Sequence, residues 1–439
     1  MRGLKTTIAL LVVLGGLAGY IFFYEARREP ADPNAKPRAF DQLSSDSIQE
    51  IEITNADGDT SRAQLDNGNW QLVQPVKADA DDGVVGTVTS NLASLEVQRV
   101  VEEKPADLKQ YGLEPARIDV GFRLKDQKEF QHLLVGDKTA TGGDVYAKRP
   151  NEPRVFLISS YLDSIFNKAP FDLRDKVILK FERDKVDGVE LSEGTSAVQF
   201  TRNGSEWRIA KPIAARADYA AAEGLLTRLS STHMLKVVDE DAADLRKYGL
   251  DRPSLAATVM AGSTRATLQL GGKAADGGFF AKDAARPTVF TVEEALATDL
   301  GKDVFDFRRK DLFDARSFSA SRLELRRGAA DPMVFEKREE GGKTTWRNAS
   351  GQTIDAPKVE DAVMRLSNLQ AQAFQQTAHA SLKTPVATAT VRFDENKTET
   401  VTFGRSGNDV FASRSDEPGS ARVDPAAFDE AMKAVDAMK

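Results

Sequence analysis

The chain has 439 residues, of which 41% are hydrophobic and 29% are charged, and it carries a formal net charge of −7. This length predicts several domains, and the composition is typical of folded domains rather than of a disordered chain. The negative charge disfavours a general nucleic-acid binder, because neutralising phosphates requires a basic surface. The sequence contains no cysteine, which excludes disulfides, thiolate metal sites, cysteine nucleophiles and a lipid-modified N-terminal cysteine.

The first long apolar stretch is Thr6–Tyr24, which contains no charged residue. Because a helix rises about 1.5 Å per residue, this stretch is just long enough to cross the core of a bilayer, and we expect a single-pass membrane anchor. The alternative is a signal peptide that is cleaved after Gly16-Leu17-Ala18. Cleavage there would leave the aromatic stretch 20–24 as an apolar N-terminus, which favours the anchor.

Charges on both sides of the anchor predict its orientation. Arg2 and Lys5 favour a cytoplasmic N-terminus, although Arg27 and Arg28 on the other side compete with them. The short N-terminal tail and the large acidic body place the body outside the cytoplasm in our prediction.

Within the anchor, Gly15 and Gly19 match the small-x-x-x-small pattern of paired membrane helices, so self-association through these glycines is one expectation. After the anchor, Pro30, Pro33 and Pro37 stiffen a charged stretch. We therefore expect an extended linker over residues 25–44.

An internal repeat organises the rest of the chain. Asn67–Pro75 (NGNWQLVQP) lies 137 residues before Gly204–Pro212 (GSEWRIAKP), and Phe171–Lys176 (FDLRDK) lies 134 residues before Phe305–Lys310 (FDFRRK). A third, divergent copy has Trp346 in the tryptophan position and ends before an FDxRxK segment. The chain is thus expected to consist of a cytoplasmic tail and anchor (1–24), the linker (25–44), repeat 1 (45–180), repeat 2 (181–314) and divergent repeat 3 (315–439).

Each copy combines alternating strands with a helix. Strands such as Ile51–Thr54 alternate apolar and polar residues, and a helix is expected to begin after Asp81, Asp218 or Asp355, whose carboxylates suit the N-cap position. Glycine ends a short turn in Tyr-Gly-Leu at residues 111–113 and 248–250. The predicted fold class is α+β: a transmembrane helix followed by three tandem repeats of a mainly antiparallel sheet with helices packed on one face.

The sequence assigns no catalytic, cofactor-binding or metal-binding residue and predicts no cofactor. His132, His233 and His379 lack the spacing of metal ligands. Asp79–Gly83 resembles the start of a calcium loop, but the twelfth position is Ser90 instead of a glutamate. No nucleophile elbow or phosphate-binding loop is present, and Gly271-Gly272 and Gly277-Gly278 are interpreted as turns between strands. The sequence does not decide whether two carboxylates are paired for glycoside cleavage, because such residues meet only in the folded chain.

Two interpretations are open for the residues that recur in each copy. Trp70, Trp207 and Trp346 either fill the core of each repeat or form a row that stacks on sugars or peptides, and burial of a large aromatic favours the core. The charged residues of the two FDxRxK segments are expected to form ion pairs or caps at the junctions between repeats.

Together, the anchor and the motifs N-G-x-W-x-[LI]-x-x-P, Y-G-L-x-x-P, L-x-[VL]-G-[DG]-K and F-D-[LF]-R-x-K resemble the bacterial domain-of-unknown-function family numbered 4340. Tyr111–Pro115 carries the second motif, which is one residue shorter than its counterpart Tyr248–Pro253. The resemblance implies a protein of the bacterial inner membrane whose soluble body lies on the periplasmic side, near ABC transporters of the gliding-motility type. It implies no catalytic residue.

The leading hypothesis is therefore a non-enzymatic accessory subunit of an ABC-transporter-type complex. One alternative is a periplasmic module that binds cell-wall glycan or peptide in a groove between copies. The other is an envelope hydrolase, which a deep pocket with two carboxylates, or with serine and histidine, would favour.

Overall fold

The structure is a computed structural model that describes residues 36–125, 127–340 and 343–438. Among these residues, no helix combines the length and the apolar character needed to cross a membrane. The expected anchor Thr6–Tyr24, with Gly15 and Gly19, lies outside the described residues.

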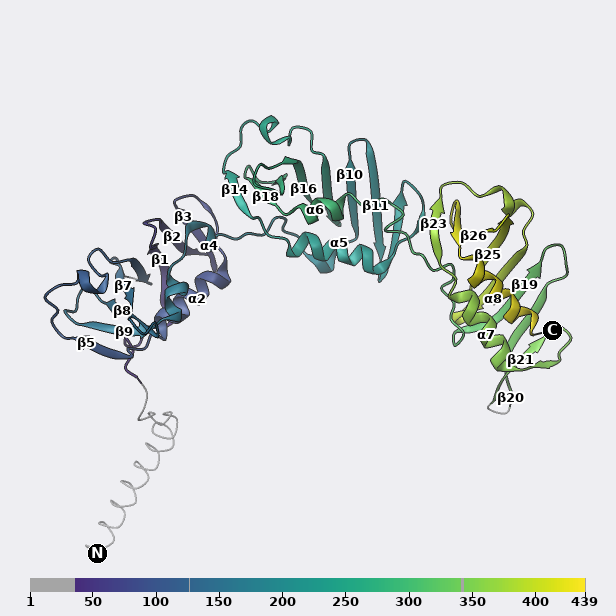
Figure 1. Cartoon of the computed structure of the whole chain (residues 1–439), viewed down its shortest axis with the longest axis horizontal. Helices are drawn as coiled ribbons and strands as arrows, with labels where there is room; N and C mark the ends of the chain where they lie inside the picture. The colour runs from purple at the N-terminus through teal and green to yellow at the C-terminus, as the bar shows by residue number, and fades with distance from the viewer. Residues whose placement is uncertain (1–35, 126, 341–342, 439) are drawn as a thin grey trace, which may run out of the picture. The chain divides into compact units, whose positions relative to one another are not determined.

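Three nine-stranded sheets form the body, and all their strand pairs are antiparallel (Figure 1). The strands of repeat 1 are β1 (Ile48–Thr54), β2 (Thr60–Asp66), β3 (Asn69–Gln74), β4 (Ala78–Asp79), β5 (Arg99–Glu102), β6 (Ile118–Leu124), β7 (Gln131–Lys138), β8 (Asp144–Lys148) and β9 (Val155–Ser159). Those of repeat 2 are β10 (Gly188–Glu193), β11 (Ser196–Asn203), β12 (Glu206–Lys211), β13 (Ala215–Arg216), β14 (Lys236–Asp239), β15 (Leu255–Ala261), β16 (Thr264–Lys273), β17 (Phe279–Asp283) and β18 (Val289–Val292). Those of repeat 3 are β19 (Ala320–Arg327), β20 (Met333–Glu340), β21 (Lys343–Asn348), β22 (Thr353–Ile354), β23 (Ala371–Gln375), β24 (Ala387–Phe393), β25 (Lys397–Ser406), β26 (Asp409–Arg414) and β27 (Ser420–Val423).

The strand order is the same in all three sheets. In repeat 1 it is β4-β3-β2-β1-β6-β7-β8-β9-β5, so two four-stranded meanders join at the β1–β6 pair and β5 forms the far edge. Because the order recurs in the other two sheets, the sequence repeat is a repeat of one fold. The α+β class and the repeated antiparallel sheet are thus confirmed.

Helices connect and cover these sheets. Repeat 1 has α2 (Asp82–Ala93), α3 (Tyr161–Phe166) and α4 (Pro170–Leu173); repeat 2 has α5 (Tyr219–Ser231) and α6 (Glu294–Leu300); repeat 3 has α7 (Ala356–Ser367) and α8 (Pro425–Asp436). Short 3₁₀ turns occupy Ser45–Ser47, Lys109–Tyr111, Arg183–Lys185, Arg246–Tyr248, Ala380–Lys383 and Asp394–Asn396. In repeat 3, α7 and α8 lie side by side and share a core with the sheet (Figure 1).

The predicted helix starts are found, with one difference in how they are capped. The Asp81 carboxylate accepts hydrogen bonds from the amides of residues 83 and 84, and the Asp218 carboxylate accepts one from residue 221. Asp355 occupies the same N-cap position before α7, but its side chain makes no capping hydrogen bond. Gly112 and Gly249 have φ values of 65° and 67°, which end the preceding 3₁₀ turns as expected.

One turn assignment from the sequence is wrong. Gly271 and Gly272 lie inside β16, beside a register shift in its pairing with β17, whereas Gly277 and Gly278 do form a turn. A Cβ atom at Gly271 would overlap the carbonyl oxygen of Tyr248, so this glycine lets the 3₁₀ turn Arg246–Tyr248 rest on the strand. The close approach explains why glycine sits within the strand.

The three tryptophans are buried, each within its own repeat. Trp346 is part of the repeat 3 core, and the indole N–H of Trp207 donates to Glu223 Oε1 at 2.9 Å. Their burial excludes the interpretation in which they form an exposed row that stacks on a ligand.

The chain divides into two compact units, with the boundary between Asp175 and Lys176. The first unit contains the sheet of repeat 1, and the second contains the sheets of repeats 2 and 3. The core of repeat 1 includes Ala39, Phe40 and Leu43, which the sequence placed in the linker. They are buried because the Phe40 ring packs edge-on against Phe122 at 4.9 Å, so the folded unit begins earlier than residue 45.

Candidate functional site

The residues examined for chemistry in the sequence have structural partners. Asp81 caps α2, the Asp82 carboxylate accepts the amide N–H of Trp70 at 2.8 Å, and the Asp79 carboxylate accepts from the Gln71 side chain at 3.1 Å. Among the described residues, no group of three or more histidine, aspartate or glutamate side chains is arranged to hold a metal ion.

The three histidines lie in separate places. His132 pairs with Asp119 across neighbouring strands at 2.8 Å, and the backbone of His233 bridges to Val177. His379 Nδ1 lies 2.9 Å from Ser381 Oγ, a serine–histidine pair that the sequence analysis did not predict.

Local geometry explains the His379–Ser381 pair. His379 Nδ1 also accepts the amide N–H of Ser381 at 3.2 Å, so the imidazole caps the 3₁₀ turn Ala380–Lys383. The imidazole ring stacks on Phe411 with 3.7 Å between the ring centroids and an angle of 6°. The pair therefore caps the turn and holds it against the sheet.

An extensive buried polar cluster lies where repeats 2 and 3 meet. The chain segment between them is hydrogen-bonded to both. The Phe307 carbonyl accepts the amide N–H of Asp218 at 2.7 Å in repeat 2, and the Lys310 carbonyl accepts that of Ala371 at 2.8 Å in repeat 3. The FDxRxK segment thus adds backbone pairing to both repeats, and its Arg308 lies between them.

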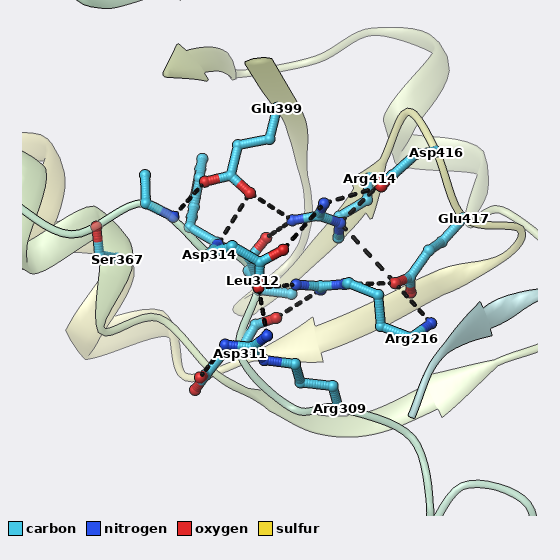
Figure 2. Close-up of polar contacts among 12 residues, drawn as sticks. Arg216, Arg309, Asp311, Leu312, Asp314, Ser367, Glu399, Arg414, Asp416 and Glu417 are labelled. Atoms are coloured by element: carbon cyan, nitrogen blue, oxygen red, sulfur yellow. Dashed lines mark hydrogen bonds and ion pairs between the residues drawn. The ribbon is translucent and has the colours of Figure 1, made fainter. Parts of the chain in front are cut away.

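Glu417, in the turn between β26 and β27, is the central carboxylate of this cluster (Figure 2). Its Oε1 accepts from Arg216 Nε at 2.6 Å, and its Oε2 accepts from Arg308 Nη2 at 2.8 Å. The side chains of Glu417, Arg308 and Arg216 are only 3%, 5% and 9% exposed. One buried carboxylate of repeat 3 therefore holds two guanidinium groups of repeat 2.

A buried ion pair within repeat 3 lies beside Glu417 and its two arginines. Arg414 Nη1 donates to Glu399 Oε2 at 2.9 Å and to the Leu312 carbonyl at 2.6 Å. The Glu399 carboxylate also accepts the amide N–H groups of Asp314 and Ala315 at 2.9 and 2.7 Å. These bonds fix the segment that leads into repeat 3, and Figure 2 shows both pairs together. We call Arg216, Arg308, Glu399, Arg414 and Glu417 the charged joint.

Partly exposed carboxylates and two further arginines, Arg309 and Arg316, surround the charged joint. Asp314 Oδ1 pairs with Arg216 Nη1 at 2.8 Å and with Arg309 Nη1 at 2.6 Å. Asp416 forms two hydrogen bonds with Arg414, at 2.9 and 3.0 Å. Two-bond guanidinium–carboxylate contacts of this kind fix orientation as well as charge.

The electrostatics of the cluster favour the ionised forms. Burial would raise the pKa of Glu417, but the charges and hydrogen bonds of Arg216 and Arg308 outweigh it and hold the pKa below its ordinary value. Burial likewise opposes ionisation of Asp416, and its bonds to Arg414 hold its pKa below the ordinary value. The pKa of Arg414 lies above its ordinary value, because Asp416 and Glu399 overcome the opposing effect of burial.

A groove opens beside the charged joint. It has a volume of about 460 Å³ and is lined by residues of both repeats, among them Arg208 and Tyr219 of repeat 2 and Asp394 and Lys397 of repeat 3. Tyr219 is 55% exposed, so an aromatic face is available to a ligand there.

The FDxRxK segments predict ion pairs at the junctions, but their sequence does not reveal the partners. Arg216 and Glu417 are 201 residues apart, and no local pattern connects them. In the matching turn of repeat 2, the place of Glu417 is taken by Arg286, which donates to the carbonyls of Val177 and Ile178 instead. The available signal was Arg308 itself, an arginine that recurs at the same place in both FDxRxK segments.

Comparisons with known proteins identify a family. None of the curated proteins compared with the chain matches it. Among solved structures, two sliding clamps of DNA polymerase from Pseudomonas aeruginosa, one with a ligand, align with 8% and 9% identity. The alignments cover 88% and 87% of this chain and 92% of each clamp chain, with TM-scores of 0.15 and 0.16, too low to indicate a common fold. The family described as "Domain of unknown function (DUF4340)" matches residues 70–231 and 207–387, which together are more than half of the chain. The protein therefore belongs to the DUF4340 family.

Proposed function

We propose that the protein is a non-enzymatic, membrane-anchored envelope protein that serves as an accessory subunit of an ABC-transporter-type complex. In this proposal, Thr6–Tyr24 anchors it in the bacterial inner membrane and the folded body lies on the periplasmic side. The observation that carries the proposal is the charged joint. It uses the buried charges of repeats 2 and 3 to hold one domain on the next, as expected of a scaffold that presents a surface to a partner.

The physical argument concerns how the buried charges are used. In a catalytic site, carboxylates and arginines face a pocket in which a reacting group is placed. In the charged joint, both Glu417 oxygens accept from arginines, and both Glu399 oxygens accept from backbone amides. These carboxylate oxygens are hydrogen-bonded to arginines and amides of the protein itself. This use of the charges supports a structural role.

Affinity purification tests the proposal. The tagged full-length chain, at native expression in gently solubilised membranes, is expected to co-purify ABC-transporter subunits. A chain with Glu417→Gln should recover less of them, because the surface formed by repeats 2 and 3 is no longer held in one arrangement. Glu430→Gln, at an exposed position on α8, is the matched control and should recover as much as the unaltered protein. Recovery of the protein alone would contradict the proposal.

The groove beside the charged joint favours a second candidate function, the binding of cell-wall glycan or peptide. Its exposed Tyr219 and its mixed charges suit a polar ligand with an apolar face. A pull-down with purified cell-wall glycan, and separately with its peptides, tests this candidate. Tyr219→Ala should lower retention, whereas Tyr161→Ala, which removes a similarly exposed tyrosine in repeat 1, should leave it unchanged. Equal retention of the two variants would exclude the groove as the binding site.

A further inference from the structure

One guanidinium nitrogen of the charged joint is buried without a protein acceptor. Arg308 Nε and Nη2 donate to Glu417, and Nη2 also donates to the Pro418 carbonyl at 3.2 Å. Arg308 Nη1 is inaccessible to solvent and has no hydrogen-bond partner among the described residues. Leaving a buried charged donor unsatisfied costs about 1–3 kcal/mol or more, so an acceptor is expected at this position.

The neighbouring aromatic ring does not supply that acceptor. The Arg308 guanidinium lies over the Phe374 ring, with its central carbon 4.2 Å from the ring centroid. This contact covers the face of the guanidinium, whereas its N–H bonds point outward in the guanidinium plane. Stacking on Phe374 therefore stabilises the cation and leaves the two N–H donors of Nη1 unused.

A small cavity adjoins Arg308. Its volume is about 10 Å³, and its lining includes Ser413, Gly419 and Ser420 as well as Arg216 and Glu417. About 10–15 Å³ is the space that one water molecule needs, and such a water requires two to four polar partners. Ser413 Oγ donates to the Gly419 carbonyl at 2.9 Å and Ser420 Oγ donates to the Thr377 carbonyl at 3.2 Å. Hydroxyl and carbonyl oxygens have two lone pairs each, so the lining offers polar groups to one small polar ligand.

The surrounding charges decide between a water molecule and a small anion. The cluster contains five guanidinium groups and five carboxylates: Arg216, Arg308, Arg309, Arg316 and Arg414 with Asp311, Asp314, Glu399, Asp416 and Glu417. Because the five arginines and five carboxylates balance, an added anion would bring an uncompensated negative charge into the cluster. A neutral molecule that accepts from Nη1 and donates to an oxygen fits the cavity better.

We propose that a single buried water molecule binds Arg308 Nη1 and completes the charged joint between repeats 2 and 3. The water accepts one N–H bond from the guanidinium and donates to oxygen atoms of the β26–β27 turn. With this water, each guanidinium nitrogen of Arg216, Arg308 and Arg414 has at least one hydrogen-bond partner.

Crystal structures of the full-length protein, grown with sodium chloride and with sodium bromide, test the proposal. The expected result is one density peak of water-like height about 2.7–3.2 Å from Nη1 and from at least one oxygen, without bromine anomalous signal. A bromide peak at this position would show that an anion occupies the site, and it would overturn the proposal of a water molecule. A bond from Nη1 to a protein oxygen, or no density, would overturn the site.

A solution measurement gives a second readout. Oxygen-17 relaxation dispersion counts long-lived internal waters in the full-length protein. Arg308→Lys keeps the positive charge opposite Glu417 but removes Nη1, and it should lower the count by about one. Arg338→Lys, at an exposed position of repeat 3, is the control and should leave the count unchanged. An unchanged count in folded Arg308→Lys protein would contradict the proposal.

Discussion

At the scale of single residues, Glu417 connects repeats 2 and 3 through a buried carboxylate. It accepts from two arginines that approach from different parts of repeat 2, Arg216 at the end of β13 and Arg308 in the FDxRxK segment. Removing one partner of a buried ion pair leaves an uncompensated charge, which costs far more than the pair itself contributes. Glu417 is therefore the residue at which a small chemical change has the largest expected effect.

The first prediction concerns Glu417→Gln. The amide cannot neutralise Arg216 and Arg308, so we expect the free energy of unfolding of repeats 2 and 3 to fall by about 3–5 kcal/mol. Urea unfolding followed by circular dichroism measures this change. Glu430→Gln, which alters an exposed carboxylate of α8, should leave the urea midpoint where it is. Equal midpoints for the two variants would show that the charged joint is energetically neutral.

The second prediction concerns pH. The pKa values of Glu417, Asp416 and Asp311 lie below their ordinary values in the folded state. Their contribution to stability is thus complete above the ordinary carboxyl range, about pH 4 for these side chains, and is lost as the pH falls through the lowered values. We expect urea midpoints to drop from neutral pH toward pH 3. The drop should be smaller in Glu417→Gln, and an equal drop would assign the acid sensitivity to other carboxylates.

At the scale of elements, a glycine inside a strand recurs in all three sheets. A Cβ atom at Gly136, Gly271 or Gly404 would overlap backbone or side-chain atoms of the 3₁₀ turn above it. The turn is Lys109–Tyr111 in repeat 1 and Arg246–Tyr248 in repeat 2, where its tyrosine begins the Tyr-Gly-Leu motif, and Ala380–Lys383 in repeat 3. The close contact between turn and strand is therefore retained in repeat 3, even though its sequence motif is lost.

The third prediction compares two glycines of repeat 2. Gly271→Ala forces the Arg246–Tyr248 turn away from β16 and should destabilise the protein by about 1–3 kcal/mol. Gly224→Ala lies on α5 with open space around the added methyl group and should stabilise it by about 1 kcal/mol, because alanine is the better helix former. Urea midpoints should shift in opposite directions. A shift in the same direction would show that the overlap at Gly271 is relieved elsewhere.

Much of the element scale could be predicted from the sequence, for physical reasons. Strand alternation, the carboxylate caps Asp81 and Asp218, and the turn glycines act over a few residues, so a short stretch of sequence records them. Gly271 was misinterpreted because a glycine required by a close contact looks the same in sequence as a glycine required by a turn. The charged joint could not be predicted, since Arg216 and Glu417 meet only after both sheets have formed.

At the scale of the whole molecule, the two compact units are unequal, and the second unit contains two complete sheets. Its two sheets share the charged joint and the backbone pairing of the FDxRxK segment. Domains that share buried ion pairs are expected to unfold together, whereas domains joined only by a linker unfold separately.

The fourth prediction follows from this coupling. In scanning calorimetry of the full-length protein, repeats 2 and 3 should unfold in one transition. Glu417→Gln should split that transition in two, with each repeat melting at its own temperature. Two transitions from repeats 2 and 3 in the unaltered protein would contradict a shared cooperative unit.

The hydrogen bonding of the segment between repeats 2 and 3 has a consequence for where the protein can be divided. Leu312 and Phe313 belong to the core of repeat 3, although they precede its first strand, and residues 307–309 complete the edge of repeat 2. A fragment that starts at residue 315 would lack part of its own interior, and one that stops before residue 307 would expose the end of its sheet. Residues 307–313 thus contribute to both repeats. We therefore expect that a gain or loss of one repeat in evolution would have to include this shared segment.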